Sequence, residues 1–196
     1  MGHASRRISQ LAASPTLAIS AKAKSLAAAG RDVLNLSAGE PDFNTPEFIR
    51  RAACEALERG ETRYTPADGT AELKQAIADK LKRENGLEYE ADQIIATTGA
   101  KQALFNAALA ALDPGDEVLI PAPYWVSYPA QAQLASAEPV FIPCPAEQGF
   151  KLTPEALEKA ITPKSRMLII NSPGNPSGAV YTREELQALG AVLDKH

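Results

Sequence analysis

The sequence has few cysteines and histidines, the residues that build disulfide frameworks and many metal centres. Its 196 residues include two cysteines, two histidines and a single tryptophan. Cys54 and Cys144 lie far apart without metal-ligand spacing, so we interpret both as small core residues. No apolar run approaches the roughly 18 residues of a membrane span, and the amino terminus lacks the apolar segment of a signal peptide. We therefore expect a protein of the reducing cytoplasm with no metal site.

Charge gives no indication of a polyanionic partner. The net charge is -4, and 22% of the residues are charged. A slightly acidic chain has no electrostatic reason to bind nucleic acid or an anionic membrane surface. The hydrophobic fraction of 45% is sufficient for a buried core, and the length suits one large domain or one and a half small ones.

From residue 94 onward the pattern alternates regularly between strands and helices. The predicted strands are 94–97, 117–120, 140–142 and 167–170, and the predicted helices are 101–112, 126–135, 153–160 and 182–193. Such alternation predicts an α/β fold with a mostly parallel sheet, right-handed crossovers and helices on both faces. The strands are continuous apolar runs, as expected for strands buried on both faces. The predicted architecture is a three-layer α/β/α domain.

The preceding part of the chain is predicted to be mainly helical. We expect an arm at 1–15, a helix at 17–29 and a short strand at 33–36. The next helix is predicted to start with Thr45 as its N-cap, followed by a proline in the first turn. A further helix is predicted to start at Thr70. Its inward-facing residues are expected to be Leu73, Ile77 and Leu81.

Four loops follow the predicted parallel strands. They comprise residues 98–101, 121–128, 143–149 and 171–178. In open α/β sheets, ligands bind beyond the carboxyl ends of the strands. We therefore expect these loops to lie near one another and to form the binding site.

The first loop has the features of an anion site. Residues 98–101 read TGAK and join a strand directly to a helix. Glycine allows close approach of a ligand, and the first N–H groups of a helix have no partner within it. Lys101 faces the positive end of the helix dipole, and a bound anion would offset that unfavourable position. The sequence has neither GxGxxG nor a Walker motif here, and a solvated surface lysine is the alternative.

Trp125 follows the next strand in the segment PAPYW at 121–125. Two prolines restrict the backbone before it, so its indole could stack on a planar ring beside the anion site. The alternative is a lid over the edge of the core. Without the neighbouring loops, that alternative is favoured.

Asn175 lies in the octapeptide NSPGNPSG at 171–178. Its two prolines and two glycines indicate a stiff loop that could hold one amide in place. A plain turn between strand and helix is the alternative. Taken together, the phosphate donors, the indole and the amide indicate a pocket for a planar heteroaromatic phosphate. Pyridoxal phosphate and a nucleotide both fit that description.

Five motifs in a fixed order carry a family resemblance. They are SAGEPDF at 37–43, YTPADG at 64–69, TGAKQAL at 98–104, PYWVSYP at 123–129 and NSPGNPSG at 171–178. From about residue 16 to the last residue, the sequence resembles the class I aminotransferases, fold-type-I pyridoxal-phosphate enzymes that include aspartate aminotransferase. The resemblance implies an arm and part of a small domain at 1–46. It also implies the amino-terminal portion of the cofactor-binding large domain at 47–196.

The resemblance also implies roles in binding pyridoxal 5'-phosphate. Asn175 would hydrogen-bond the phenolic oxygen of the pyridine ring, and Trp125 would stack on that ring. The first helical turn, Gly99, Ala100 and Lys101, would hold the phosphate.

Substrate and partner contacts are implied in the same way. Gly39 would line the site of the substrate carboxylate, with Thr16 assisting, and Trp125 and Asn175 would also border the substrate. Lys101 would bind a distal carboxylate and so favour aspartate and glutamate. Tyr64 would reach the cofactor of a second subunit, which implies a homodimer in the full-length enzyme. Residues 11–13 lack the lysine that some prephenate-accepting relatives carry, which disfavours prephenate.

The departure from the family lies in length. Members are roughly twice as long, and the lysine that forms the Schiff base has no counterpart among these 196 residues, nor do the aspartate at the pyridine nitrogen and the arginine for the α-carboxylate. The chain therefore resembles the amino-terminal half of an aminotransferase, with no catalytic residue of its own and no expected activity alone. The alternatives are a carbon–sulfur lyase or synthase of the same fold type, and a non-catalytic phosphate-ligand or interaction module.

Overall fold

A computed structural model describes residues 4–9, 11, 15–36, 39 and 41–196. The chain forms two compact units. One combines residues up to 12 with Gly99–His196, and the other consists of residues 13–98. These two units do not test the predicted domain boundary between residues 46 and 47, which stays a prediction.

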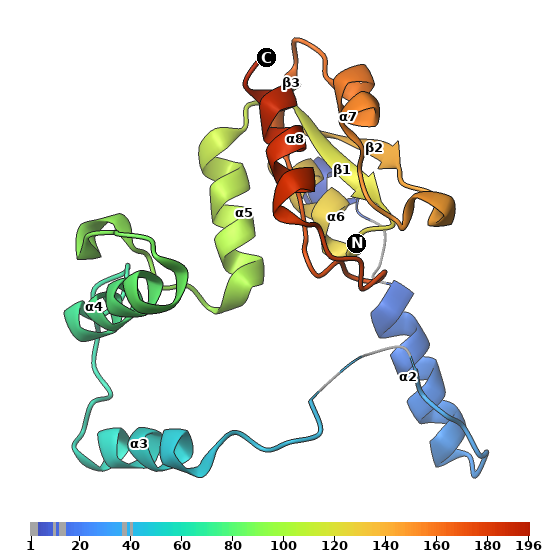
Figure 1. Ribbon diagram of the computed structural model, residues 1–196. Coiled ribbons are helices and arrows are strands. Elements are labelled where there is room, and N and C mark those ends of the chain that lie inside the picture. Colours follow the sequence, from blue (N-terminus) through green and yellow to red (C-terminus); the bar gives the residue numbers. More distant parts are fainter. Residues whose placement is uncertain (1–3, 10, 12–14, 37–38, 40) are drawn as a thin grey trace. The chain divides into compact units, whose positions relative to one another are not determined.

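A parallel three-stranded sheet forms the centre of the first unit (Figure 1). Its strands are β1 (Glu117–Ala122), β2 (Glu138–Pro143) and β3 (Ser165–Leu168), in the order β2-β1-β3. Leu119 of β1 pairs with Val140 of β2 and with Leu168 of β3. The middle residues of β1 are almost fully buried, as expected for a central strand covered on both faces.

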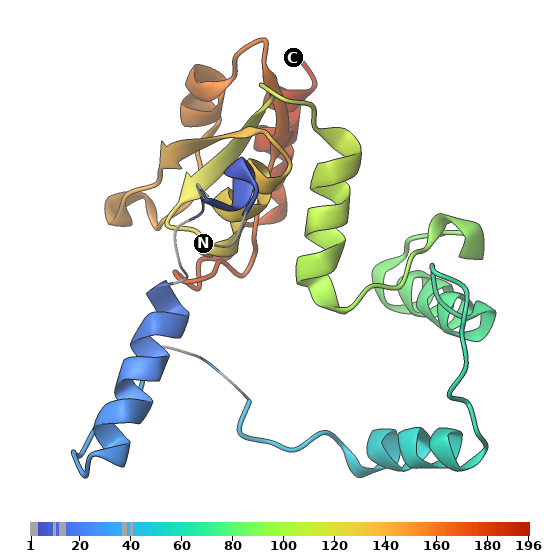
Figure 2. The same cartoon turned by 180° about the vertical axis from the view of Figure 1, so that it is seen from behind.

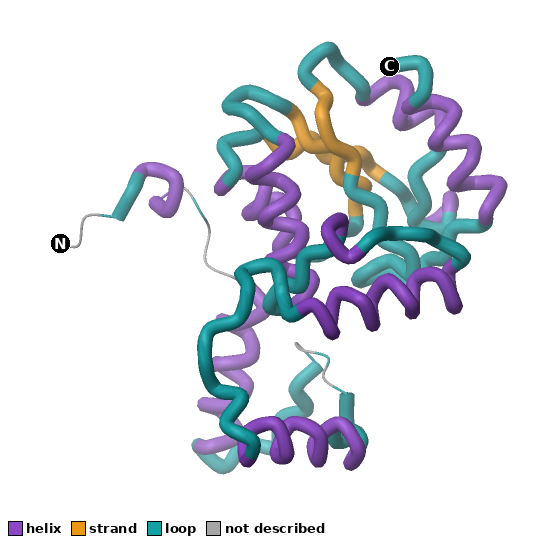
Figure 3. Tube along the Cα trace, turned by 90° about the vertical axis from the view of Figure 1, so that its left-hand side faces the viewer, coloured by secondary structure: helices purple, strands orange, loops and turns teal. Residues whose placement is uncertain are grey.

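Helices cover both faces of this sheet. They are α5 (Gly99–Ala111), α6 (Ser127–Leu134), α7 (Pro154–Ala160) and α8 (Arg183–Leu193). Val118 and Ile120 of β1 pack in an apolar cluster with α5 and α6. Leu119, between them, packs in a second cluster with α7 and α8, because successive strand side chains point to opposite faces. The predicted three-layer α/β/α architecture is confirmed, and Figures 2 and 3 show the strands between their helices.

Side-chain caps define where several helices begin. Thr153 precedes α7, and its hydroxyl accepts the N–H of Ala156. Thr182 precedes α8 and forms a reciprocal capping box with Glu185. Each cap satisfies backbone N–H groups that the first helical turn leaves without an internal acceptor. The helices that follow β2 and β3 therefore begin at residues defined by side-chain caps.

The second unit is helical. It contains α2 (Pro15–Ala28), α3 (Glu47–Glu58), α4 (Ala71–Lys80), the π-helical segment Leu81–Asn85 and the short 3-10 helix Ala91–Gln93. Thr70 caps α4 as predicted, since its hydroxyl accepts the N–H of Leu73. The first unit also includes α1 (Arg6–Ser9) and the 3-10 helix Ala146–Gln148. Within the described residues, no helix combines the length and apolarity needed to cross a membrane.

Five local predictions are wrong. Cys54 is exposed and is not a core residue, whereas Cys144 is buried as predicted. Neither 33–36 nor 94–97 forms a strand, because neither extended segment pairs with another strand among the described residues. The N–H of Ala96 instead donates to the carbonyl of Asp68 at 2.8 Å. Pro46 replaces Thr45 as the N-cap of α3, without a side-chain cap bond. Leu73 does not face inward but is 48% exposed, and Ala78 is the buried residue of α4.

Candidate functional site

Lys101 and Trp125 meet beyond the carboxyl end of β1. The Lys101 ammonium lies 4.7 Å from the centre of the Trp125 ring. Trp125 also makes an edge-to-face contact with Tyr128 of α6, with ring centres 5.5 Å apart. A cation over an indole face is attracted to the negative π surface. The structure thus brings together the cation and the flat aromatic ring that the sequence assigned to neighbouring loops.

Lys101 stands in the first turn of α5, which begins at Gly99. Gly99 has a φ of +78°, a backbone conformation that residues with a Cβ rarely adopt. The Lys101 carbonyl accepts a hydrogen bond from the Gln131 side chain of α6 at 2.8 Å. This turn directs the N–H groups of Ala100 and Lys101 out of the helix end, where an anion is favoured.

A network of hydrogen bonds fixes the loop that carries Asn175. The Asn171 side-chain oxygen accepts the Asn175 backbone N–H at 2.8 Å. The N–H of Gly174 donates to the Ala179 carbonyl at 2.8 Å, and the N–H of Gly178 donates to the Gly174 carbonyl at 2.7 Å. A Cβ at Gly174 would lie only 2.7 Å from the Ser177 hydroxyl oxygen, so the loop is closely packed there. These bonds and this close packing restrain the backbone of residues 171–178.

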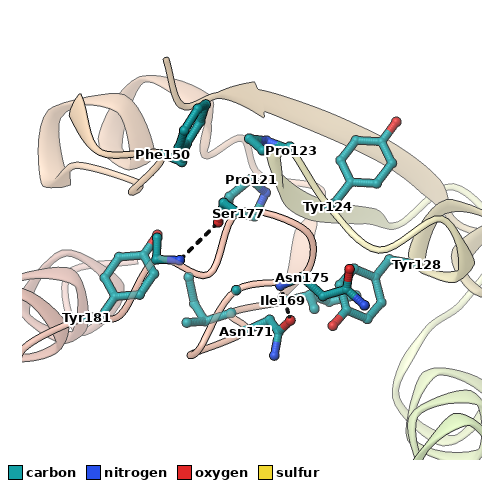
Figure 4. A pocket seen from close by; sticks show the side chains of 13 residues that line it. Pro121, Pro123, Tyr124, Tyr128, Phe150, Ile169, Asn171, Asn175, Ser177 and Tyr181 are labelled. Carbon is teal, nitrogen blue, oxygen red and sulfur yellow. Dashed lines mark hydrogen bonds between the residues drawn. The ribbon is translucent and has the colours of Figure 1, made fainter. Parts of the chain in front are cut away.

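One pocket contains side chains from the β1 and β3 loops (Figure 4). Asn171 and Asn175 line it from the β3 side, and Tyr124 and Tyr128 line it from the β1 side. Because Tyr128 contacts Trp125, this pocket adjoins the Lys101 and Trp125 pair. Lys101, Trp125 and Asn175 thus belong to one continuous set of contacting and pocket-lining side chains. We call this set the strand-end site.

Two buried phenols in this region remain neutral at neutral pH. Burial raises the pKa of Tyr128. Burial also raises the pKa of Tyr181, whose hydroxyl accepts the Leu152 N–H at 2.6 Å. A neutral phenol can donate a hydrogen bond while adding no charge, so Tyr128 supplies an uncharged donor and a ring to the pocket wall.

The donor set of the strand-end site fits an anionic planar ligand. The N-terminal turn of α5 and the Lys101 ammonium suit a phosphate. Trp125 offers an aromatic face, and Asn175 offers a neutral amide for a polar ring substituent. Pyridoxal phosphate combines a phosphate group and a planar ring with a polar substituent in one small molecule.

Three other predicted site residues belong to the helical unit. Tyr64 and Gly39 are exposed residues of the helical unit. Thr16 lies in α2 of the same unit. Residues 12 and 13, part of the segment used to disfavour prephenate, lie outside the described residues. The roles assigned to Tyr64, Gly39 and Thr16 stay predictions.

Sequence reasoning missed several residues that shape the site. Gln131 is a buried polar side chain bonded to the α5 turn, and Asn171 holds the backbone of Asn175. Tyr128 links Trp125 to the pocket. The sequence of α6 contains two glutamines, and no local signal distinguished the exposed Gln133 from the buried Gln131. Its partner could not be read from the pattern, since Lys101 is 30 residues away.

An α/β/α fold with a helix N-terminus, an indole and an amide beyond its strand ends is typical of domains that bind a small cofactor. The chain belongs to the family described as aminotransferase class I and II, which matches residues 31–196. This family depends on pyridoxal phosphate. The expected family, fold class and cofactor are thereby confirmed.

Relatives with high sequence identity to this chain are named aspartate or aspartate/prephenate aminotransferases. The chain is 56% identical over 192 residues to an aspartate/prephenate aminotransferase of Nitrosomonas europaea, covering 98% of this chain and 48% of that protein. It is 54% identical to the aspartate aminotransferase of Bacillus subtilis, covering 97% of this chain and 49% of that protein. The chain therefore spans about half the length of these relatives.

Solved structures of aspartate aminotransferases also match the whole of this chain over about half of their own length. The aspartate aminotransferase of Rhizobium meliloti superimposes with a TM-score of 0.95 at 52% identity, covering all of this chain and 49% of that one. The Thermus thermophilus enzyme with maleate gives a TM-score of 0.95 at 47% identity and is covered to 51% of its length, again with all of this chain matched.

Proposed function

We propose that this chain forms the cofactor-binding portion of an aminotransferase. The proposed reaction moves an amino group from L-aspartate or a related amino acid to 2-oxoglutarate through pyridoxal phosphate. The observation that carries the proposal is the Lys101 ammonium 4.7 Å from the Trp125 ring at the N-terminus of α5. The names of the relatives support the reaction and the substrate class.

Each residue of the strand-end site has a proposed task. The backbone of Gly99, Ala100 and Lys101 holds the phosphate, and Trp125 supports one face of the ring. The Asn175 amide donates to the phenolic oxygen and fixes the rotation of the ring. When bound, pyridoxal phosphate supplies the electron sink that the amino-acid chemistry requires. These side chains bind and orient, and the burial of Tyr128 limits water beside the ring.

Substrate recognition is assigned to a partly overlapping group. The Lys101 ammonium attracts the distal carboxylate of aspartate or glutamate. Trp125 and Asn175 border the substrate, and Gly39 and Thr16 belong near its α-carboxylate. Prephenate is a second candidate acceptor, because relatives named for both aspartate and prephenate are 55% and 56% identical to this chain. The absence of a lysine at residues 11–13 argues against it.

Assembly and location complete the proposal. Tyr64, fully exposed here, is proposed to contact the cofactor of a second subunit in a homodimer. The free thiols of Cys54 and Cys144 are compatible with a reducing cytoplasm. We retain the predicted division into an arm with part of a small domain at 1–46 and a large-domain portion at 47–196.

A coupled assay tests the reaction. A protein of the relatives' length that contains this chain is incubated with aspartate and 2-oxoglutarate, and both oxaloacetate and glutamate are measured. Equal formation of the two products is expected. A parallel incubation contains a β-substituted amino acid instead of aspartate. Release of ammonia or a thiol from it, without formation of glutamate, would indicate the rival lyase. Absence of both reactions in a folded protein would favour a non-catalytic ligand-binding module.

A further inference from the structure

Among the described residues, Gln131 is the only buried residue of the polar and charged types. It is only 7% exposed, and its neighbour Ala132 belongs to the apolar cluster between the sheet and α5 and α6. Burying an amide is unfavourable unless it is hydrogen-bonded. Its side-chain nitrogen donates to the Lys101 carbonyl at 2.8 Å, which ties the middle of α6 to the first turn of α5.

The two helices joined by this bond carry different halves of the strand-end site. The first turn of α5 supplies the proposed phosphate-binding N–H groups. Trp125 is attached to the start of α6, since its carbonyl accepts the Tyr128 N–H at 3.0 Å and its ring contacts the Tyr128 ring. A shift of α6 along α5 would therefore change the separation between the indole and the phosphate turn.

We propose that Gln131 is a positioning residue that sets this separation for a ligand with both a ring and a phosphate. The inference rests on the proposed function, because it assumes that pyridoxal phosphate occupies the strand-end site. A ligand held at two points gains affinity when the points are already correctly spaced. A ligand that uses only one of the points gains nothing from the spacing. This difference separates positioning from a general contribution to folding.

The test uses the 196-residue protein and its single tryptophan as a fluorescent reporter. Pyridoxal phosphate and pyridoxal are titrated while quenching of Trp125 is followed, and inorganic phosphate is titrated as a competitor. Gln131→Met keeps most of the side-chain volume and removes the donor. We expect its affinity for pyridoxal phosphate to fall roughly three- to tenfold, the effect of one hydrogen bond. Affinities for pyridoxal and for phosphate should each change less than about twofold.

Gln133→Met is the matched control, because Gln133 is exposed on the same helix. It should bind all three ligands as the unsubstituted protein does. Circular dichroism establishes that the variants fold, and Gln131→Leu replaces Gln131→Met if the latter does not. Equal weakening for all three ligands, or unchanged affinity for pyridoxal phosphate, would overturn the positioning role alone. No saturable binding by the unsubstituted protein would overturn the proposed cofactor site and this inference with it.

Discussion

Lys101 is the residue with two proposed tasks, at the phosphate and at the distal carboxylate. Its ammonium is exposed, and the contact with Trp125 fixes its direction. Lys101→Ala, made in a protein of the relatives' length, should lower kcat/KM for aspartate by about tenfold or more, the effect of a lost charge-assisted bond. The value for alanine, which has no distal carboxylate, should fall far less. Steady-state kinetics with both amino acids measures this, and equal losses would contradict the dicarboxylate assignment.

Tyr181 is hydrogen-bonded to the loop that carries Asn175. Its buried hydroxyl accepts the Leu152 N–H at 2.6 Å, and its own N–H donates to the Ser172 hydroxyl at 3.1 Å. Tyr181→Phe leaves the Leu152 N–H without this acceptor and should lower the free energy of unfolding by about 1–2 kcal/mol. Urea denaturation measures the change. Tyr124→Phe is the control, since it keeps the ring stacked on Phe141, and a loss as large as that of Tyr181→Phe would refute the explanation.

At this scale the sequence revealed residues whose role depends on local position. Trp125 and Asn175 follow β1 and β3, and the strand-end rule grouped them. Lys101 was grouped with them through a predicted strand at 94–97 that is absent, and it instead lies in the first turn of α5. Gln131 and Tyr181 act through contacts 30 and 29 residues away. Such pairs depend on how helices pack, which no single segment encodes.

Among the elements, α8 shows how a capping box fixes the helix after the Asn175 loop. The Thr182 hydroxyl accepts the Glu185 N–H at 3.2 Å, and the Glu185 carboxylate accepts the Thr182 N–H at 2.7 Å. Thr182→Ala should lower the free energy of unfolding by about 1 kcal/mol. Gln187→Ala, an exposed change within the same helix, should have little effect. Thermal or urea unfolding compares the two, and equal effects would argue against the cap.

Glu185 also makes the stability of this unit depend on pH. The side-chain hydrogen bond from Lys151 lowers the pKa of Glu185 below its ordinary value of 4.5, and the Thr182 N–H adds to this. The unfolded chain therefore binds the proton more readily than the folded chain. The contribution is fully present above the ordinary pKa and is lost as the pH falls through the lowered value.

Glu185→Gln removes this contribution. Urea unfolding should show the variant less stable than the parent at neutral pH, with the difference shrinking as the pH falls below about 4. Glu147→Gln, at an exposed position, is the control. A difference that does not change between pH 7 and pH 3 would show that the ion pair with Lys151 has no part in it.

Element type was predictable where a signal was local. Helices with a threonine at their start and strands flanked by turns were found near their true positions, as with Thr70 and α4. Apolar runs at 33–36 and 94–97 suggested strands that are absent. A strand needs a hydrogen-bonding neighbour, and the sequence of a run does not show whether one exists.

The whole chain spans about half the length of its named relatives, and this determines the activity expected of the chain by itself. The resemblance predicts no counterpart of the family's cofactor-attaching lysine among the 196 residues. The chain by itself should therefore bind pyridoxal phosphate without measurable turnover of aspartate and 2-oxoglutarate. The coupled assay, with a protein of the relatives' length as positive control, measures this. Turnover by the purified 196-residue protein would refute the prediction.

A crystal structure of this protein with pyridoxal phosphate would show which residues hold the cofactor. We expect the phosphate at the first turn of α5, the ring against Trp125 and the Asn175 amide directed at the phenolic oxygen. A ring bound away from Trp125, or a phosphate held by residues outside the first turn of α5, would contradict the account.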